Sequence, residues 1–358
     1  MPESSGRGFF APPGFPRVVG GVEVDNQIWL APLAGITFAS FRRFHRALGA
    51  GLVHTEMVSA LGLKYKGRKT KELLYGGDDE APCALQLFGS SADDFSAGAE
   101  IALEMREFAA LEVNMACPMP KVTKKGAGAK LLEKAGEAAA IVKGLKRFGI
   151  PVWAKVRLIP RDSGNTTEDF CARLFEAGAD FIFVHGRTPA QRYEGRASCA
   201  EVCGAARAFP GRIGGSGDCY APEDLTAYLD GGCAAALAAR GALRDALLIP
   251  RTLAALGAEV PEELRSPSPE AQKELLLRLC GGICGTEGER LALMTARRML
   301  GALFRGFEGA PRLRRAGAAA ASWGEMEALL AGFSFESSPQ GGEKEEEING
   351  ADASLELN

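Results

Sequence analysis

The sequence has no long apolar segment. No stretch of its 358 residues approaches the roughly 18 uninterrupted apolar residues that a membrane-spanning helix needs. Residues 1–21 are rich in Pro, Gly and Ser but hold no continuous apolar core of the kind that a secretory signal contains. We therefore expect no membrane partner and a cytoplasmic location.

Signatures of metal binding are also absent. The nine cysteines include no Cys-x-x-Cys pair, and their odd number indicates reduced thiols. Cys199 with Cys203, and Cys280 with Cys284, are spaced four residues apart on expected helices, where we interpret them as small buried hydrophobic residues. The sequence therefore predicts no structural metal.

Charge is distributed unevenly along the chain. Residues 334–358 hold seven acids and one lysine, which gives this segment a net charge of −6. Because the net charge of the whole chain is −3, residues 1–333 carry a net charge of +3. The acidic, Gly-rich composition of residues 334–358 predicts a disordered tail. The mildly basic body is compatible with a nucleic-acid partner but does not require one.

With 46% apolar residues the chain can bury a large core. Short apolar runs predict eight strands: Ile28–Leu33, Leu52–Met57, Cys83–Phe88, Leu111–Met115, Val152–Val156, Phe181–Val184, Arg212–Gly215 and Ala234–Ala238. Helical patterns fill the gaps: Phe38–Leu48, Ala92–Phe108, Ala127–Phe148, Thr167–Ala177, Ala197–Ala206 and Pro222–Leu229. Eight βα units in about 230 residues favour a (β/α)8 TIM barrel over an open doubly wound sheet.

The composition of the sequence changes after residue 258. Prolines are followed there by helical patterns at Glu270–Leu279, Glu289–Leu303 and Met326–Leu330. Arginines gather here: Arg290, Arg297, Arg298, Arg305, Arg312, Arg314 and Arg315. One arginine alone is equally consistent with a solvated helix face, but the cluster favours contact with phosphates. We expect four segments: an N-terminal extension (1–25), a TIM-barrel catalytic domain (26–257), a small C-terminal helical domain (258–333) and the acidic tail (334–358).

Cys117 stands between the end of an apolar strand and a Lys- and Gly-rich loop. The surrounding residues 113–121 read Val-Asn-Met-Ala-Cys-Pro-Met-Pro-Lys. A thiol in this place can act as nucleophile, metal ligand or proton donor. No second cysteine and no histidine lies within about a dozen residues to supply a metal pair or an adjacent base. We therefore interpret Cys117 as a lone acid above the strands.

Candidate catalytic and binding residues stand at the carboxyl ends of the predicted strands. They are Pro32, Ala34, Glu56, Gln86, Asn114, Lys155, Arg157, His185, Ser216, Asp218 and Arg240. In a barrel these ends share one rim, where active sites lie. His185 is followed by Gly-Arg-Thr at a strand end, which favours a functional role. We interpret His45 and His54 as satisfied core histidines.

With these residues the chain resembles the tRNA-dihydrouridine synthases, flavin-containing barrels that reduce a uridine of tRNA. The resemblance covers about residues 29 to 245, in order: Ala31-Pro32-Leu33-Ala34-Gly35-Ile36-Thr37, Thr55-Glu56-Met57, Leu85-Gln86-Leu87, Asn114-Met115-Ala116-Cys117-Pro118, Lys155-Val156-Arg157, His185-Gly186-Arg187-Thr188, Gly217-Asp218 and Arg240-Gly241-Ala242. Each motif alone is weak, whereas the ordered series is specific.

The resemblance implies reduction of a tRNA uridine to 5,6-dihydrouridine by FMN. Hydride would pass from N5 of reduced FMN to carbon 6, and Cys117 would give a proton to carbon 5. The implied FMN contacts are Pro32, Leu33, Ala34, Gln86, Lys155, His185, Ser216, Gly217, Asp218, Ala239 and Arg240. Asn114, Arg157 and Tyr193 would contact the flipped-out base. NADPH or NADH would re-reduce the flavin, and the sequence does not choose between them.

The resemblance implies that the FMN phosphate rests on the backbone of residues 216–218 and 239–241, the phosphate cradle. The chain departs from the family pattern there, because Ser216 and Ala239 stand in place of Asn and Gly. The sequence does not decide the effect on FMN affinity. A basic run, Lys64 to Lys71, suits tRNA phosphates or a solvated loop equally well. We expect a monomer, although the sequence leaves the oligomeric state open.

Three alternatives to the leading interpretation remain. One is a dihydroorotate or dihydropyrimidine dehydrogenase-like flavoenzyme that acts on a free pyrimidine. Another is a degenerate barrel that binds tRNA without turnover. The third is an aldolase-type barrel with Lys155 as a Schiff-base lysine. In such an enzyme Cys117 and Gln86 would have no role in the reaction.

Overall fold

The computed structural model describes residues 10–160, 163–304 and 307–335. The chain divides into two compact units, residues 1–266 and 267–358. The division lies beyond the expected boundary at 257 because α11 (Leu248–Ala255) and α12 (Glu262–Arg265) contact each other within the first unit. Arg305, the first nine residues of the expected extension and the expected tail from residue 336 lie outside the described residues.

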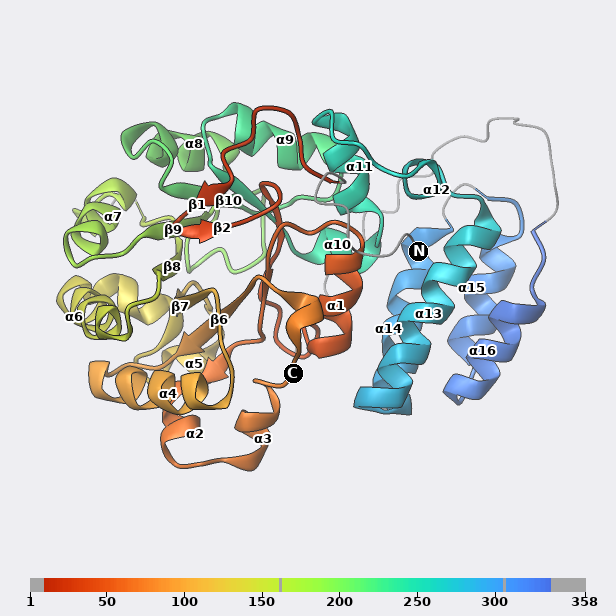
Figure 1. Ribbon diagram of the computed structural model, residues 1–358, viewed down its shortest axis with the longest axis horizontal. Helices are drawn as coiled ribbons and strands as arrows, with labels where there is room; N and C mark the ends of the chain where they lie inside the picture. The colour runs from red at the N-terminus through yellow and green to blue at the C-terminus, as the bar shows by residue number, and fades with distance from the viewer. Residues whose placement is uncertain (1–9, 161–162, 305–306, 336–358) are drawn as a thin grey trace. The chain divides into compact units, whose positions relative to one another are not determined.

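The first unit is a closed barrel of parallel strands (Figure 1). Its strands are β3 (Ile28–Leu30), β4 (Val53–His54), β5 (Val58–Ser59), β6 (Cys83–Phe88), β7 (Ala110–Met115), β8 (Val152–Arg157), β9 (Phe181–His185), β10 (Ile213–Ser216) and β11 (Ala235–Ala238). The hydrogen-bonded order is β4-β3-β11-β10-β9-β8-β7-β6-β5, and β4 also pairs with β6, which closes the sheet. Because β4 and β5 are two parts of one strand position, the barrel has eight such positions, and the predicted (β/α)8 fold is confirmed.

Helices alternate with these strands around the barrel, among them α4, α6, α7, α8 and α9 in Figure 1. The helices of this unit are α1 (Ala39–Ala47), α2 (Ala60–Lys64), α3 (Arg68–Glu72), α4 (Ala92–Met105), α5 (Pro120–Thr123), α6 (Ala135–Leu145), α7 (Thr167–Glu176), α8 (Cys199–Ala208), α9 (Pro222–Asp230) and α10 (Arg240–Arg244), besides α11 and α12. Three short 3₁₀ segments are η1 (Asp78–Glu80), η2 (Gly128–Glu133) and η3 (Lys146–Phe148). Among the described residues, no helix is both long and apolar enough to cross a membrane.

Two expected elements differ from the structure. The strand predicted at Leu52–Met57 is interrupted after His54 and resumes at Val58. Glu56, in this gap, accepts a hydrogen bond from the amide of Gly35. The single helix predicted at Ala127–Phe148 is divided into η2, α6 and η3. Lys134 has φ −131° and ψ 59°, a conformation that ends one segment before the next begins.

A hairpin closes one end of the barrel. Strands β1 (Val18–Val19) and β2 (Val22–Glu23) pair antiparallel, and Val19 and Val22 join the core cluster that also contains Trp29, Trp153 and Phe181. Trp153 Nε1 donates to the Gly20 carbonyl over 2.8 Å. Part of the expected N-terminal extension is thus packed as the barrel floor, at the amino ends of the strands.

One glycine of β10 is required by its packing. A Cβ on Gly215 would lie 2.2 Å from Cδ1 of Tyr228, and the ring is held in place because its hydroxyl donates to the carbonyls of Ser216 and Gly217. We expect Gly215→Ala to lower the free energy of unfolding by at least about 2 kcal/mol. Chemical denaturation followed by tryptophan fluorescence measures it. Gly282→Ala on exposed helix surface is the matched control and should raise stability by about 1 kcal/mol, since nothing lies within 4 Å of its added methyl.

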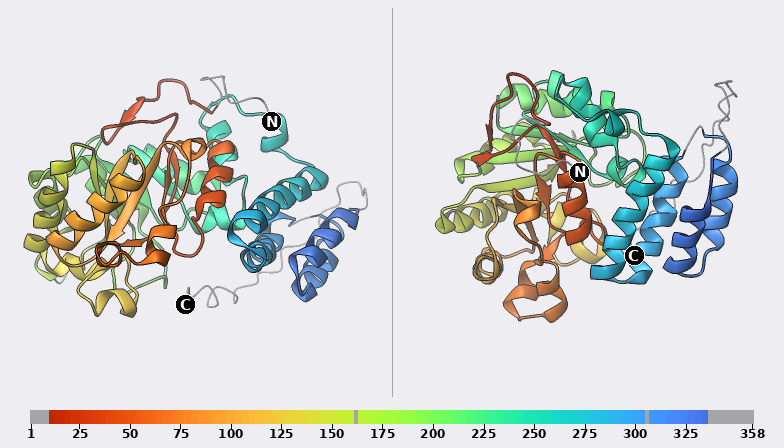
Figure 2. Two further views of the ribbon diagram at one scale, coloured as in Figure 1. Left: turned by 60° about the horizontal axis from the view of Figure 1, so that its bottom comes forward. Right: turned by 45° about the vertical axis from the view of Figure 1, so that its right-hand side comes forward.

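The second unit consists of helices that run side by side, drawn in blue in Figure 2. They are α13 (Pro269–Glu287), α14 (Glu289–Leu303), α15 (Ala310–Ala319) and α16 (Trp323–Gly332). The pattern at Glu289–Leu303 predicts α14 correctly, α13 and α16 are longer than expected, and α15 was not predicted. Arg290, Arg297, Arg312 and Arg315 have exposed side chains on α14 and α15.

Candidate active site

Parallel pairing brings the predicted polar residues to one rim of the barrel. Four registered pairs follow each other around it: Gln86 with Glu112, Asn114 with Lys155, Arg157 with His185, and His185 with Ser216. Side chains two residues apart on a strand point to the same side, so Lys155 and Arg157 continue the inward row that begins at Trp153. Carboxyl ends of barrel strands therefore gather these groups in one place.

The loop that carries Cys117 is held by side-chain and backbone contacts. Asn114 Oδ1 accepts the amides of Ala116 (3.1 Å) and Cys117 (3.0 Å), and the Cys117 carbonyl accepts from the Ala129 amide over 2.9 Å. Gly128 has φ +61°, and a Cβ there would lie 2.6 Å from the Cys117 carbonyl oxygen. Only glycine fits this position, and the backbone of Cys117 is consequently fixed on both sides.

The half-buried thiol of Cys117 has a raised pKa. Burial raises the pKa by penalising the thiolate, and the amide of Met119 with the charges of Arg157, Lys121 and Lys155 offsets only part of that effect. The thiol is therefore protonated at neutral pH. A protonated thiol can donate a proton but is a poor nucleophile and a poor metal ligand.

Lys155 is a buried cation in the middle of the barrel mouth. Its side chain is only 9% exposed, and among the described residues its Nζ has no hydrogen-bond partner. Burial lowers the pKa of Lys155 to about 8, although the Glu112 carboxylate acts in the opposite direction. At neutral pH the ammonium group still carries its charge and has unused donors for an electron-rich ligand.

His185 is neutral at this rim. Burial is the main cause that lowers its pKa well below the ordinary value, and the positive charges of Lys155, Arg157, Arg187 and Arg240 lower it further. A neutral imidazole offers one donor and one acceptor. His185 can therefore bond a polar ligand without adding charge.

Asp218 organises the ends of β9, β10 and β11. Arg187 donates to both of its carboxylate oxygens over 2.7 Å each, Arg240 donates over 3.2 Å and the Ala197 amide over 2.8 Å. Burial raises the pKa of Asp218, but the hydrogen bonds and charges of Arg187, Ala197 and Arg240 outweigh it, and the net pKa is lowered. Asp218 is thus an anionic anchor for two arginines.

Backbone amides beside Asp218 are free to bind an anion. Within the described residues, the amides of Gly217, Asp218, Arg240 and Gly241 donate to no acceptor. Gly217 has φ +128° and Asp218 has φ +51°, so that consecutive amides form the kind of concavity that binds phosphate. Ala239 precedes α10 with φ −115° and ψ −109°, and it packs against the barrel core cluster.

Arg157 and Tyr193 lie together at the outer edge of the rim. Arg157 donates to the carbonyls of Ala116 (2.7 Å), Arg192 (2.7 Å) and Thr188 (3.1 Å), so it braces the Cys117 loop against the loop after β9. The Tyr193 ring is 47% exposed and lies 5.6 Å from the Arg157 guanidinium and 5.1 Å from that of Arg240. An aromatic ring between two cations is suited to stacking against a planar base.

Pro32, Leu33 and Ala34 follow β3 as a half-buried turn at the same rim. The next amide, of Gly35, donates to the Glu56 carboxylate, which ties this turn to the neighbouring strand position. Within the described part of the chain, no hydrogen bond or ion pair joins these three residues directly to Lys155 or Cys117, so they share the rim but not the polar network.

Sequence reasoning missed Glu112 and misjudged His45. Glu112 is fully buried on β7, two residues before Asn114, and the alternation of inward-facing positions was the signal that could have found it. His45 is fully buried, but neither ring nitrogen has a partner in the described structure, and burial lowers its pKa to about 3. His45 is a core histidine that is not satisfied.

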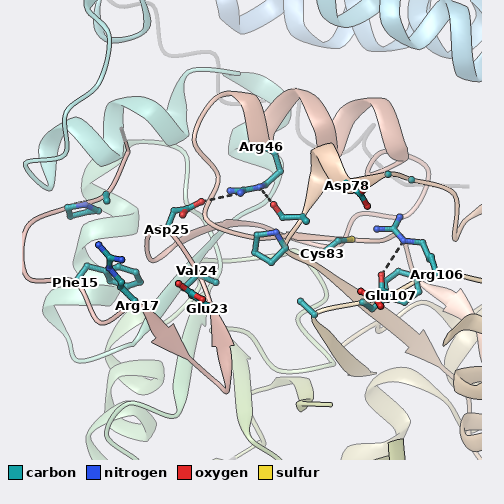
Figure 3. Close-up of a pocket in the computed structure, with 18 of the residues that line it drawn as sticks. Phe15, Arg17, Glu23, Val24, Asp25, Arg46, Asp78, Cys83, Arg106 and Glu107 are labelled. Atoms are coloured by element: carbon teal, nitrogen blue, oxygen red, sulfur yellow. Dashed lines mark hydrogen bonds and ion pairs between the residues drawn. The ribbon is translucent and has the colours of Figure 1, made fainter. Parts of the chain in front are cut away.

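A separate cavity lies away from this rim (Figure 3). Its volume is about 950 Å³, and its walls come from the floor hairpin and from residues at the amino ends of β3, β6 and β7, including Asp25, Cys83 and Ala109. None of the predicted site residues lines it. Arg46 projects toward this cavity, but its guanidinium already donates hydrogen bonds to Asp25 and to the carbonyls of Ala50 and Ala81.

Metal-ligating groups do not gather in the described part of the chain, where no cluster of three or more His, Cys, Asp or Glu side chains could hold an ion. All nine cysteines are free thiols. The candidate site therefore consists of a protonated thiol, a buried lysine, a neutral histidine and an anion-binding turn.

Fold and site define a (β/α)8-barrel protein with its chemistry at the carboxyl ends of the strands. A family model described as dihydrouridine synthase matches residues 29–336. The chain therefore belongs to the dihydrouridine synthase family of enzymes.

Individual relatives agree with this assignment. A probable tRNA-dihydrouridine synthase of Mycobacterium tuberculosis is 31% identical over 87% of this chain and 83% of its own length. tRNA-dihydrouridine synthase B of Pseudomonas aeruginosa is 31% identical over 83% of this chain and 89% of its own length. Among solved structures, the old yellow enzyme from Trypanosoma cruzi covers 71% of this chain and 95% of its own with a TM-score of 0.51 and 11% identity, which supports the barrel fold alone.

Proposed function

We propose that this protein reduces a uridine of tRNA to 5,6-dihydrouridine, with FMN as its cofactor and NADPH or NADH as the reductant. The observation that carries the proposal is the protonated thiol of Cys117, held by Asn114 on a loop beside the buried cation Lys155. Reduction of a pyrimidine double bond needs a proton donor of this kind, and family membership supplies the reaction class.

The residues at the rim fit FMN. The free amides of Gly217, Asp218, Arg240 and Gly241, with the Arg240 guanidinium beside them, suit a phosphate. Lys155 has unused donors and a positive charge for the polar edge of the flavin ring. His185 is neutral and fits a hydrogen bond to the ring or to the phosphate arm.

The remaining cofactor contacts follow from the positions of the side chains. Pro32, Leu33 and Ala34 present a half-buried apolar turn for the ring face. Gln86 Nε2 keeps one amide hydrogen after its bond to Glu112. Ser216 and Ala239 form the walls of the phosphate cradle, and the Ala239 methyl is directed into the core instead of the cradle.

In this proposal bound FMN supplies the hydride to carbon 6 of the uracil ring. Cys117 Sγ donates a proton to carbon 5, and its raised pKa keeps that proton available at neutral pH. Asn114 retains one amide hydrogen for a carbonyl of the base. Arg157 keeps the Cys117 loop in place, and Tyr193 stacks on the flipped-out nucleotide.

Basic side chains support a tRNA substrate. In the described structure, no acidic side chain pairs with the exposed arginines of α14 and α15. The same holds for Lys66, Lys69 and Lys71 around α3. Lys64 and Arg68 are less available, since they pair with Asp94 and Glu72. A free-pyrimidine enzyme has no need of such a surface, and a dependence of binding on salt concentration is expected for contacts with phosphates.

Nucleoside mass spectrometry tests the proposal. Unmodified tRNA is incubated with the purified protein, FMN and NADPH, and a gain of two hydrogens by uridine is the expected result. No gain, with a bound and reducible flavin, would point to a free pyrimidine or another RNA. No gain and no flavin, with tRNA still bound, would indicate a degenerate barrel.

A further inference from the structure

A buried chain of hydrogen bonds runs from Glu112 to the Cys117 loop. Gln86 Nε2 donates to Glu112 Oε1, and Asn114 Nδ2 donates to Gln86 Oε1 over 2.8 Å. Asn114 Oδ1 then accepts the amides of Ala116 and Cys117. Glu112 and Gln86 are 0% exposed and Asn114 is 4% exposed, so water does not compete for these groups.

The direction of this chain is determined from both ends. A carboxylate only accepts hydrogen bonds, so the NH₂ group of Gln86 must face Glu112. Backbone amides only donate, so the oxygen of Asn114 must face Ala116 and Cys117. The middle contact, from the Asn114 NH₂ to the Gln86 oxygen, is the one arrangement that satisfies both constraints.

Glu112 adds a second constraint, beside the backbone amides of the Cys117 loop, against turning over the two amide side chains. An Asn or Gln side chain rotated by about 180° exchanges donor and acceptor at nearly the same shape. If Gln86 turned over, it would present NH₂ to the NH₂ of Asn114, and Asn114 would follow by presenting NH₂ to the backbone amides of the Cys117 loop. The buried carboxylate excludes this alternative.

We propose that Glu112 is a positioning residue: through Gln86 and Asn114 it holds the Cys117 backbone in the orientation that presents the thiol to the substrate. The catalytic consequence rests on the proposed function, but the effect on the Cys117 loop does not. Glu112 makes no hydrogen bond to Cys117 in the described structure, and its link to the Cys117 loop runs through the two amides. Its charge also acts on Lys155, so the test must separate the two effects.

Glu112→Leu tests the proposal because leucine has a similar size and no acceptor. The readout is the rate at which iodoacetamide alkylates Cys117 in the full-length protein, measured peptide by peptide with mass spectrometry. Glu112→Leu removes the hydrogen bond from Gln86 to Glu112. If the stabilisation of one hydrogen bond, about 1 kcal/mol, is transmitted through Asn114, the population of the open loop rises about fivefold, and we expect Cys117 to be alkylated about five times faster. Cys199 and Cys284, which are also half-buried, should keep their rates.

Glu112→Gln separates the hydrogen-bond chain from the buried charge. Glutamine at position 112 removes the charge of a carboxylate but keeps an oxygen that can accept from Gln86. We therefore expect Glu112→Gln to restore the wild-type alkylation rate of Cys117 and to keep uridine turnover above that of Glu112→Leu.

Two results would overturn the proposal. One is an unchanged Cys117 rate in a folded Glu112→Leu protein, and the other is an equal acceleration in Glu112→Gln and Glu112→Leu, which would assign the effect to charge. If Glu112→Leu does not fold, Gln86→Leu breaks the chain at its next link and must accelerate Cys117 alkylation in the same way. Alkylation needs no tRNA and no reductant, so a protein inactive on uridine can still confirm or refute the role of Glu112.

Discussion

Cys117→Ala is expected to lower the turnover of uridine in tRNA by about 10²–10⁴-fold, the usual contribution of a positioned general acid. Cys117 places a protonated thiol on the loop held by Asn114, and alanine leaves the backbone contacts of Asn114 and Ala129 in place. Flavin binding and flavin reduction by NADPH should stay at the wild-type level. Single-turnover mass spectrometry of tRNA and anaerobic flavin bleaching measure the two half-reactions separately.

Cys284→Ala is the matched control for this prediction, because Cys284 is also a half-buried free thiol but lies in the helical unit. Its turnover should equal that of the wild type. Wild-type turnover in Cys117→Ala would remove Cys117 from the role of acid. The pKa of Cys117 is raised, so in the intact protein the acid form persists at neutral pH and is lost only as the pH rises through that raised value.

Lys155→Met should slow flavin reduction by about 10²–10³-fold, the effect expected when a buried group that stabilises developing negative charge is removed. Methionine keeps the length of the side chain but not its charge, and the neutral His185 beside Lys155 cannot replace that charge. The rate of flavin bleaching by NADPH, followed in a stopped-flow instrument without oxygen, measures the loss. Lys143→Met, on an exposed part of α6, is the control and should bleach at the wild-type rate.

The pH dependence of the same rate gives a second test of Lys155. Burial lowers the pKa of Lys155 from 10.5 to about 8, so its cation is present below that pH and is lost as the pH rises through it. Wild-type flavin reduction should therefore fall above about pH 8, and Lys155→Met should show no such fall. A decline of equal size in both proteins would show that another group titrates there.

Local patterns were enough for most of the barrel. Cys83–Phe88 was predicted to its ends, and the other parallel strands were predicted within one or a few residues, because strands buried on both faces are short apolar runs bounded by turns. The errors fall where a distant group intervenes. Glu56, in the gap between β4 and β5, binds the amide of Gly35, and the Gly20 carbonyl accepts from the Trp153 indole in a barrel floor that composition did not indicate.

The candidate site residues divide in a similar way. Cys117, Lys155, His185 and Asp218 stand at predicted strand ends, and the (β/α)8 fold alone is enough to gather such residues at one rim. Their chemical states were not accessible from the sequence. Burial raises the pKa of Cys117 and lowers that of Lys155, and burial exists only once the barrel has closed.

The sequence by itself determined the order of the strands and helices, the closed barrel and the kinds of side chain at its mouth, because apolar periodicity and turn residues act over short distances along the chain. Only the tertiary structure decided which polar groups meet. Asn114 reaches Gln86 across 28 residues and Gln86 reaches Glu112 across 26. Such contacts depend on the register between neighbouring strands, and a register shift of one residue would turn each of these side chains to the opposite face.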